Sequence, residues 1–239
     1  MSVEFDGTVE QRIDFGTNTN VYNCAQKSIS LWAHFDSVTK ATPPAYKYLC
    51  GLIDDSSGND SWSFLMGYKA NGDIGFQHSF SGSIGAWYTA TGVVETTTPH
   101  HIVLTFDNTS ASNDPVVYVD TVTKSTTEEQ TPSGTAIVGV SSLFRVGAGA
   151  ANPIDGKLQD VRIYNRILSA NEVSALYNSR CLRNVMNGLV FWAPMWGANA
   201  ATFDGNTLSA SETVVDWIGG AVGVPIGSPI GRGNTFQGN

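Results

Sequence analysis

Charged residues are scarce in this chain, and basic residues are the scarcer kind. Of its 239 residues 14% are charged, with 13 Lys and Arg against 21 Asp and Glu, and the formal net charge is −8. Nucleic acids and anionic membrane surfaces attract proteins that carry basic patches. The composition therefore predicts neither as a partner. The acidity also has a simpler interpretation, because a moderate net charge keeps a protein in solution.

Cysteine is rare as well, and long apolar runs are missing. Cys24, Cys50 and Cys181 are odd in number and widely spaced, so they form neither a disulfide framework nor a metal-binding C-x-x-C motif. One Cys24–Cys50 bridge and three buried thiols are the two alternatives. No apolar stretch reaches the roughly 20 residues of a membrane-spanning helix, so no membrane insertion is expected. The first fifteen residues lack the basic start and apolar core of a signal peptide, and none is expected.

Catalytic motifs are also missing. The sequence contains no H-E-x-x-H, G-x-S-x-G or P-loop pattern, and its four histidines do not have the spacing of metal ligands. Retaining glycoside hydrolysis needs two carboxylates close together, which alternate positions on one strand can supply. The one Glu-x-Asp pattern, Glu4 to Asp6, lies at the start of the chain and is followed by Gly7. A glycoside hydrolase is therefore disfavoured, and we expect a protein that is not an enzyme.

What the chain does contain is a series of short strand-like runs. In residues 28–35, for example, Ile29, Leu31 and Phe35 fall on one face, which is the period of a β-strand. Many short strands with polar or glycine-rich turns between them are typical of an antiparallel sandwich. The predicted strands are residues 28–35, 46–53, 62–69, 73–80, 86–94, 101–107, 116–120, 143–149 and 157–164, with a polar loop at 125–134.

One short helix is expected after the last of these strands. Ser169 precedes Glu172 by three positions, the spacing of a capping box, and Val173 and Leu176 form an apolar face. Beyond the helix, residues 187–198 are apolar and aromatic and are predicted to form a packed strand. Residues 225–239 are rich in Gly and Pro and are predicted to be an extended tail that needs a partner surface to become ordered.

Four segments in order carry a resemblance to a known family. They are V-E-F-D-G (3–7), S-I-S-L-W (28–32), H-H-I-V-L-T-F-D with V-V-Y-V-D (within 100–120), and G-K-L-Q-D-V-R-I-Y-N-R-I-L-S-A-N-E-V-S-A-L-Y (156–177). This pattern resembles the laminin G-like, pentraxin-like jelly-roll domain of the concanavalin A-like lectin/glucanase superfamily, of the type found in bacteriophage virion proteins. The resemblance implies an all-β fold in which two antiparallel sheets pack face to face, with a short helix after the last strand.

The resemblance also implies a division of the chain. Residues 1–182 would be the jelly-roll domain, and residues 183–239 a C-terminal segment. Within that segment, G-L-V-F-W-A-P-M-W-G-A (188–198) is similar to tails on laminin G-like proteins of bacterial viruses. The segment would pack on the sandwich, or anchor the protein to a neighbouring subunit. The predicted assembly contacts are Phe191, Trp192, Trp196, Trp217, Arg232 and Phe236.

Two kinds of ligand site are predicted. Glycan binding uses exposed aromatic rings with polar side chains beside them, and the candidates next to polar loops are Trp62, His78, Trp87 and Tyr88. The alternative is that these rings are buried, as most aromatics are in a sandwich. For calcium, the resemblance implies a site between the first and last strands, with Asp6 and Asp160 as the matching carboxylates. Here the alternative is that these Asp side chains cap turns, and Gln159, where the family has an acidic residue, favours it.

The predicted function is a non-enzymatic structural protein of a viral particle, either a capsid decoration or a tail protein. Its partners would be other virion proteins or copies of itself, and its outer surface could bind host glycans. The virion would then be its location. The alternative is a carbohydrate-binding module or lectin that is not part of a virion and acts outside the cell.

Overall fold

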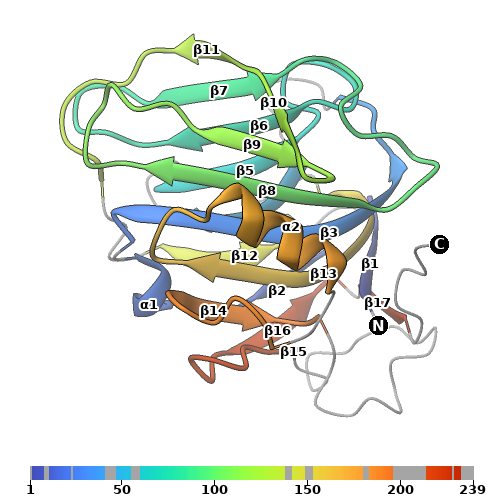
Figure 1. The fold of residues 1–239 in the computed structure, drawn as a ribbon. Helices are drawn as coiled ribbons and strands as arrows, with labels where there is room; N and C mark the ends of the chain where they lie inside the picture. The colour runs from blue at the N-terminus through green and yellow to red at the C-terminus, as the bar shows by residue number, and fades with distance from the viewer. Residues whose placement is uncertain are drawn as a thin grey trace.

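The computed structural model describes residues 2–7, 11–22, 24–40, 47–54, 60–137, 142–148, 153–179, 183–195, 214–227 and 229–232. These residues form two antiparallel β-sheets that pack face to face, and a helix lies across the outer side of one of them (Figure 1). The predicted fold class, an all-β two-sheet sandwich with a short helix towards its C-terminal end, is confirmed, and further short strands follow that helix.

The sheet that carries the helix is called sheet A. Its strand order is β10-β9-β8-β3-β13-β1-β17, and β14 pairs with β13 beyond the end of β1. The long strand β13 therefore has β3 on one side and both β1 and β14 on the other. The bounds are β1 (Ser2–Asp6), β3 (Gln26–Ser37), β8 (His100–Asp107), β9 (Val116–Val119), β10 (Val122–Lys124), β13 (Asp155–Tyr164), β14 (Leu189–Ala193) and β17 (Ile230–Arg232).

The second sheet, sheet B, has the order β11-β7-β6-β5-β4-β12-β2-β16-β15. Its bounds are β2 (Arg12–Asp14), β4 (Lys47–Ile53), β5 (Trp62–Met66), β6 (Ile74–His78), β7 (Gly85–Thr89), β11 (Thr126–Gln130), β12 (Leu143–Val146), β15 (Val214–Val215) and β16 (Val222–Ile226). Each strand predicted from the sequence is present in one of the two sheets, with ends that differ by a few residues. The short helix α1 (Thr19–Tyr22) links β2 to β3.

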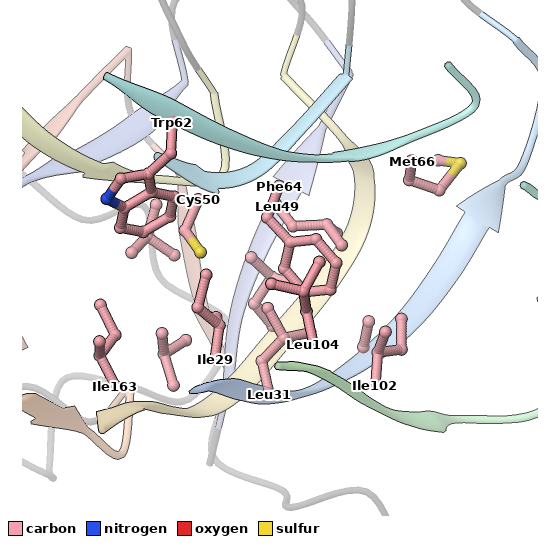
Figure 2. Packing of buried hydrophobic residues seen from close by; sticks show 14 of the residues in the cluster. Ile29, Leu31, Leu49, Cys50, Trp62, Phe64, Met66, Ile102, Leu104 and Ile163 are labelled. Carbon is pink, nitrogen blue, oxygen red and sulfur yellow. The ribbon is translucent and has the colours of Figure 1, made fainter. Parts of the chain in front are cut away.

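The core fills the space between the sheets. Alternate residues of each strand point inwards, so Leu31 and Leu104 of sheet A face Trp62 and Phe64 of sheet B (Figure 2). Cys50 lies in this core, and both it and Cys24 are free, buried thiols. The alternative of a Cys24–Cys50 bridge is therefore wrong, while Cys181 lies outside the described residues.

The helix α2 (Ala170–Asn178) begins as predicted. The Ser169 side chain accepts a hydrogen bond from the Glu172 amide, and the Glu172 carboxylate accepts one from the Ser169 amide, which completes the capping box. Val173 and Leu176 are buried against Tyr164 and other apolar side chains on the outer face of sheet A. The helix is thus a cover for that face, and no helix in the described part of the chain is long and apolar enough to cross a membrane.

One segment that was predicted to be a loop forms a strand, and parts of the predicted tail also form strands. Residues 126–130, placed in a loop by the sequence, form β11 at one end of sheet B. They were missed because an exposed strand at the end of a sheet needs no apolar alternation. In the predicted tail, β16 pairs with β2 and β17 pairs with β1. The partner surface that orders these residues is the sandwich itself, and residues 233–239 lie outside the described residues.

Candidate functional site

Tyrosine side chains gather on the outer face of sheet B. The register places Tyr48 of β4, Leu65 of β5, Gly75 of β6 and Tyr88 of β7 in one row across four neighbouring strands. Paired residues in a row point to the same side of a sheet. A small cluster separate from the main core forms here, with half-buried Tyr48 and Tyr88 packed against it. We call this surface the tyrosine face.

A third tyrosine, Tyr68, lies against the middle of the row. A Cβ atom on Gly75 would be 2.6 Å from the Tyr68 Cβ, so the close approach of Tyr68 to β6 requires glycine. Gln77 Nε2 donates a hydrogen bond of 3.1 Å to the Tyr68 hydroxyl. The Tyr68 and Tyr88 ring centroids are 6.3 Å apart. The backbone and Gln77 together fix where the aromatic surface lies.

Polar groups border the tyrosine face on the β4 side. Asp60 Oδ2 accepts hydrogen bonds from the Tyr48 hydroxyl at 3.0 Å and from Ser63 Oγ at 2.8 Å. Ser63 is paired in register with Gln77, whose side chain is half-buried. Ser63 is fully buried, so the carboxylate of Asp60 and the amide of Gln77 are the polar groups beside the aromatic rings. Carboxylates and amides bind sugar hydroxyls, and aromatic rings bind the faces of sugar rings.

On the β11 side the border is an ion pair. Lys69 Nζ lies 5.3 Å from the centre of the Tyr68 ring and pairs with the Glu129 carboxylate of β11. Their side chains are 37% and 39% exposed, so the pair contributes little to folding stability.

Only one of the predicted glycan-binding residues lies on this face. Tyr88 does, but its neighbour Trp87 points into the core, where its ring stacks 6.1 Å from Phe76. Trp62 is also a core residue, 6.1 Å from the Phe144 ring. A buried ring cannot stack on a sugar, so the prediction needs correction at Trp62 and Trp87. The reason is that adjacent residues of a strand face opposite sides.

His78 is corrected for the same reason. It is 1% exposed, and its Nε2 atom is 3.2 Å from the Nζ atom of buried Lys27. Its Nδ1 atom is 3.0 Å from the Ser79 carbonyl oxygen, which assigns the proton to Nδ1 and makes Nε2 the acceptor for Lys27. Burial lowers the pKa of His78 to about 3 and that of Lys27 to about 8. His78 is thus a neutral polar group inside the sandwich.

The two predicted calcium ligands are far apart. Asp6 is paired with Asp155 at the start of β13, and Asp160 lies five positions further along that strand, a separation of roughly 17 Å. The structure therefore corrects the proposed pairing of Asp6 with Asp160. Within the described ranges, no three or more His, Cys, Asp and Glu side chains form a group that could hold a metal ion.

Asp160 has a structural partner instead. Its carboxylate accepts hydrogen bonds from Arg162 Nε and a terminal Arg162 nitrogen, both at 3.0 Å, and from Trp192 Nε1 at 2.6 Å. All three side chains are buried. The carboxylate that the family resemblance singled out for calcium is therefore engaged in joining β13 to β14.

The predicted assembly contacts divide into three groups. Phe191 and Trp192 are buried in their own chain, which corrects their assignment to a neighbouring subunit. Trp217 is 41% exposed and its ring meets that of Trp192 edge-on, with centroids 5.0 Å apart. The backbone of Arg232 pairs with Ser2 in sheet A, while Trp196 and Phe236 lie outside the described residues.

Sequence reasoning missed Tyr48, Tyr68 and Gln77, and it considered Asp60 only as a loop carboxylate for calcium. A usable signal was present in β6, where Gly75 and Gln77 alternate with the apolar Ile74 and Phe76. That alternation predicts that one side of the strand is not part of the core. The side chain that covers Gly75, however, comes from the turn after β5, and only the structure shows this.

Comparisons with known proteins agree with the sandwich fold. Residues 6–174 match a protein family described as the concanavalin A-like lectin/glucanases superfamily. The chain belongs to this superfamily. No curated protein matches it in sequence. This membership confirms the predicted jelly-roll family, and none of the comparisons points to a bacterial virus.

Several solved structures of this superfamily fold are similar to the chain. A Bacteroides ovatus protein provisionally assigned as carbohydrate-binding superposes with a TM-score of 0.61 at 14% identity; 98% of this chain is covered, but the chain spans only 61% of that protein. The heptameric SAP-like pentraxin of Limulus polyphemus gives a TM-score of 0.57 at 14% identity, with 93% of this chain and 94% of the pentraxin chain covered. The Ruminococcus gnavus IT-sialidase CBM40, bound to α2,3-sialyllactose, gives a TM-score of 0.54 at 14% identity, with 74% of this chain and 96% of the CBM40 chain covered. Identities this low show the fold alone.

Proposed function

We propose that this protein is a non-enzymatic carbohydrate-binding protein that recognises an oligosaccharide on the tyrosine face of sheet B. The observation that carries the proposal is the pair of half-buried rings of Tyr48 and Tyr88, supported by the buried Tyr68 that packs on Gly75, with the polar side chains of Asp60 and Gln77 beside them. Membership of a lectin and glucanase superfamily, and similarity to structures described as carbohydrate-binding, support the same function.

The shape of the face favours an extended ligand. Tyr48 and Tyr88 are three strand steps apart in the register, which is about 14 Å at the usual spacing of strands. A single sugar ring is shorter than this. We therefore infer that the ligand is an oligosaccharide that lies across the strands, with its ring faces on Tyr48 and Tyr88.

Binding without hydrolysis fits the carboxylates better than catalysis does. Asp60 already accepts hydrogen bonds from Tyr48 and Ser63, and Glu129 is paired with Lys69. In sheet A, Glu4 is paired with Lys157 at 3.3 Å. Lys157 also pairs with Asp36 at 3.3 Å. Retaining hydrolysis needs two carboxyl groups about 5 Å apart on either side of the bond that is cleaved, and on the tyrosine face Asp60 and Glu129 each have separate partners instead.

The role in a viral particle stays a prediction. The two buried residues of β14, Phe191 and Trp192, are not available to a neighbouring subunit. The similar structures favour the alternative made from the sequence, a carbohydrate-binding module or lectin. Co-purification of the protein with viral particles would support the virion role.

A glycan array tests the proposal. The wild-type protein should bind one class of oligosaccharide, and Tyr88→Ala and Tyr48→Ala should each weaken that binding by about fivefold, since an aromatic contact contributes about 1 kcal/mol. Tyr177→Ala is the matched control, because Tyr177 is 36% exposed but lies on α2 over sheet A. Binding that is unchanged in both sheet B variants, or no binding to any glycan, would overturn the proposal.

A further inference from the structure

A pocket of about 350 Å³ lies on the other side of the molecule, at the end of sheet A. It is formed where the loop between β8 and β9 meets the turn between β13 and α2. This volume is within the range of small-ligand sites. The residues that line it are Thr105, Phe106, Asp107, Ser112, Asn113, Asp114, Val116 and Ile167.

Thr105 is a buried polar group that faces this pocket. It is 4% exposed and is paired in register with Ser28 of β3 and Val116 of β9. The Ser28 hydroxyl lies on the outer side of the sheet, where it donates to the Arg166 carbonyl oxygen and accepts from the Leu168 amide. Thr105 must point to the same side, and in the described part of the chain its hydroxyl forms no hydrogen bond. Because Thr105 lines the pocket, a ligand there could accept a hydrogen bond from this hydroxyl.

Two carboxylates lie at the pocket without a cation. Neither Asp107 nor Asp114 forms an ion pair with any Lys, Arg or His of the described residues. Buried Lys27 acts on Asp107 from the core side, but at a distance beyond that of an ion pair. Arg166, next in sequence to the pocket residue Ile167, is paired with Glu172. The negative charge at the pocket is therefore not balanced by a contacting cation.

Both carboxylates are held in place from outside the pocket. Asp114 Oδ1 accepts a hydrogen bond of 2.8 Å from the indole of Trp87, which is anchored in the core. Asp107 accepts hydrogen bonds from the Thr109 hydroxyl at 2.6 Å and from Gln26 Nε2 at 2.9 Å. Those hydrogen bonds lower the pKa of Asp107, so it stays ionised. Asn113 is fixed by a bond of 2.9 Å from its Nδ2 atom to the Asp107 carbonyl oxygen.

The remaining wall is apolar. Val116 and Ile167 are 37% and 39% exposed, and both line the pocket. A ligand that fits must therefore combine a positive charge for Asp107 and Asp114, an acceptor for the Thr105 hydroxyl, and a body that covers Val116 and Ile167. Neutral sugars lack the positive charge, and metal ions lack the apolar body.

We propose that this pocket binds a small organic ammonium compound, with the ammonium group between Asp107 and Asp114 and a ring or chain over Val116 and Ile167. The pocket shares no residue with the tyrosine face, so this proposal and the proposed function can be tested independently. An amino sugar and a simple cyclic amine both carry this chemistry, and the choice between them depends on whether the ligand also accepts a hydrogen bond from Thr105.

Amide chemical-shift changes in a titration of ¹⁵N-labelled full-length protein locate the site directly. Glucosamine should shift the amides of residues 105–116, whereas N-acetylglucosamine, in which the charge is removed, should not. Cyclohexylamine serves as the ammonium compound without hydroxyl groups. Glucosamine binding tighter than cyclohexylamine binding supports an amino-sugar ligand, and the reverse supports a simple amine. Binding should weaken as NaCl is added, because part of the attraction is between exposed charges.

Two variants test the assignment of residues. Asp114→Asn keeps an oxygen for Trp87 but loses the charge, and should weaken glucosamine binding about fivefold. Thr105→Val keeps the shape, should not lower stability because it removes an unpaired hydroxyl, and should weaken glucosamine binding about threefold. Tyr88→Ala is the control and should bind glucosamine like the wild type. Equal binding of glucosamine and N-acetylglucosamine, shifts that map elsewhere, or no shifts with either ammonium compound would each overturn the proposal.

Discussion

Trp192 Nε1 donates a hydrogen bond of 2.6 Å to Asp160, and Arg162 binds the same carboxylate while its guanidinium lies 4.5 Å from the centre of the Trp192 ring. Asp160 has a φ of 54° at a bulge in β13, between Gln159 and Arg162. Asp tolerates this left-handed conformation better than most residues do. The Asp-Val-Arg part of the family motif thus has a structural explanation, since it fastens β14 to β13.

The first prediction concerns this cluster. Asp160→Ala leaves the buried Arg162 guanidinium without its carboxylate, and should lower the free energy of unfolding by about 3–5 kcal/mol. Urea unfolding at neutral pH measures the change. The control is Glu129→Gln, which breaks the exposed pair with Lys69 and should cost less than about 1 kcal/mol. Equal effects of the two variants would show that the Asp160 cluster has no special role in stability.

The second prediction concerns acid stability. Hydrogen bonding to Arg166 lowers the pKa of Glu172 from 4.5 to about 2. A lowered carboxyl pKa contributes stability above the ordinary value, and this stability is lost as the pH falls from about 4.5 to about 2. The wild type should therefore exceed Glu172→Gln by about 1 kcal/mol at pH 7, and the difference should vanish near pH 2 in urea titrations. A difference that does not change with pH would contradict the role of the charge.

The third prediction concerns alkaline conditions. Burial lowers the pKa of Lys27 from 10.5 to about 8, so between these values the unfolded chain holds a proton that the folded protein has released. Stability should then rise with pH across this window, by at most about 1.4 kcal/mol per pH unit. Urea unfolding from pH 7 to pH 10 should show this rise in the wild type and in Lys124→Met, but not in Lys27→Met. The same slope in all three proteins would refute it.

The fourth prediction concerns the construction of the tyrosine face. Gly75→Ala would put a methyl group 2.6 Å from the Tyr68 Cβ and 2.9 Å from its Cγ. Tyr68 must then move, and stability should fall by about 1–3 kcal/mol. Near-ultraviolet circular dichroism should change with it, because Tyr68 lies in a cluster with other rings. An unchanged spectrum and stability would mean that Tyr68 does not rest on β6 in solution.

The sequence was sufficient for the fold and insufficient for the site. Alternation in runs such as 28–35 predicts strands, and the capping box of Ser169 and Glu172 predicts the helix, because both are local signals. Which of Trp87 and Tyr88 faces outwards is not local. Both neighbours are aromatic, and only the packing of the other sheet decides which one is buried.

The C-terminal segment illustrates the same limit over a longer distance. Its aromatic residues predict burial against a surface, but they do not indicate whether that surface belongs to the same chain or to a neighbouring subunit. Trp192 finds its partners, Asp160 and Arg162, in β13 of its own chain. The pairing of Asp6 with Asp160 was implied by the family resemblance and not by a local signal, and the register of β1 with β13 places Asp155 opposite Asp6 instead.

The most direct test of the account is a calorimetric titration with the oligosaccharide that binds best on the array. The account predicts that Tyr88→Ala raises the Kd about fivefold, while Tyr177→Ala on α2 and Asp114→Asn at the pocket leave it unchanged. If Tyr88→Ala binds with the wild-type Kd, or if Tyr177→Ala loses binding instead, the glycan does not bind on the tyrosine face.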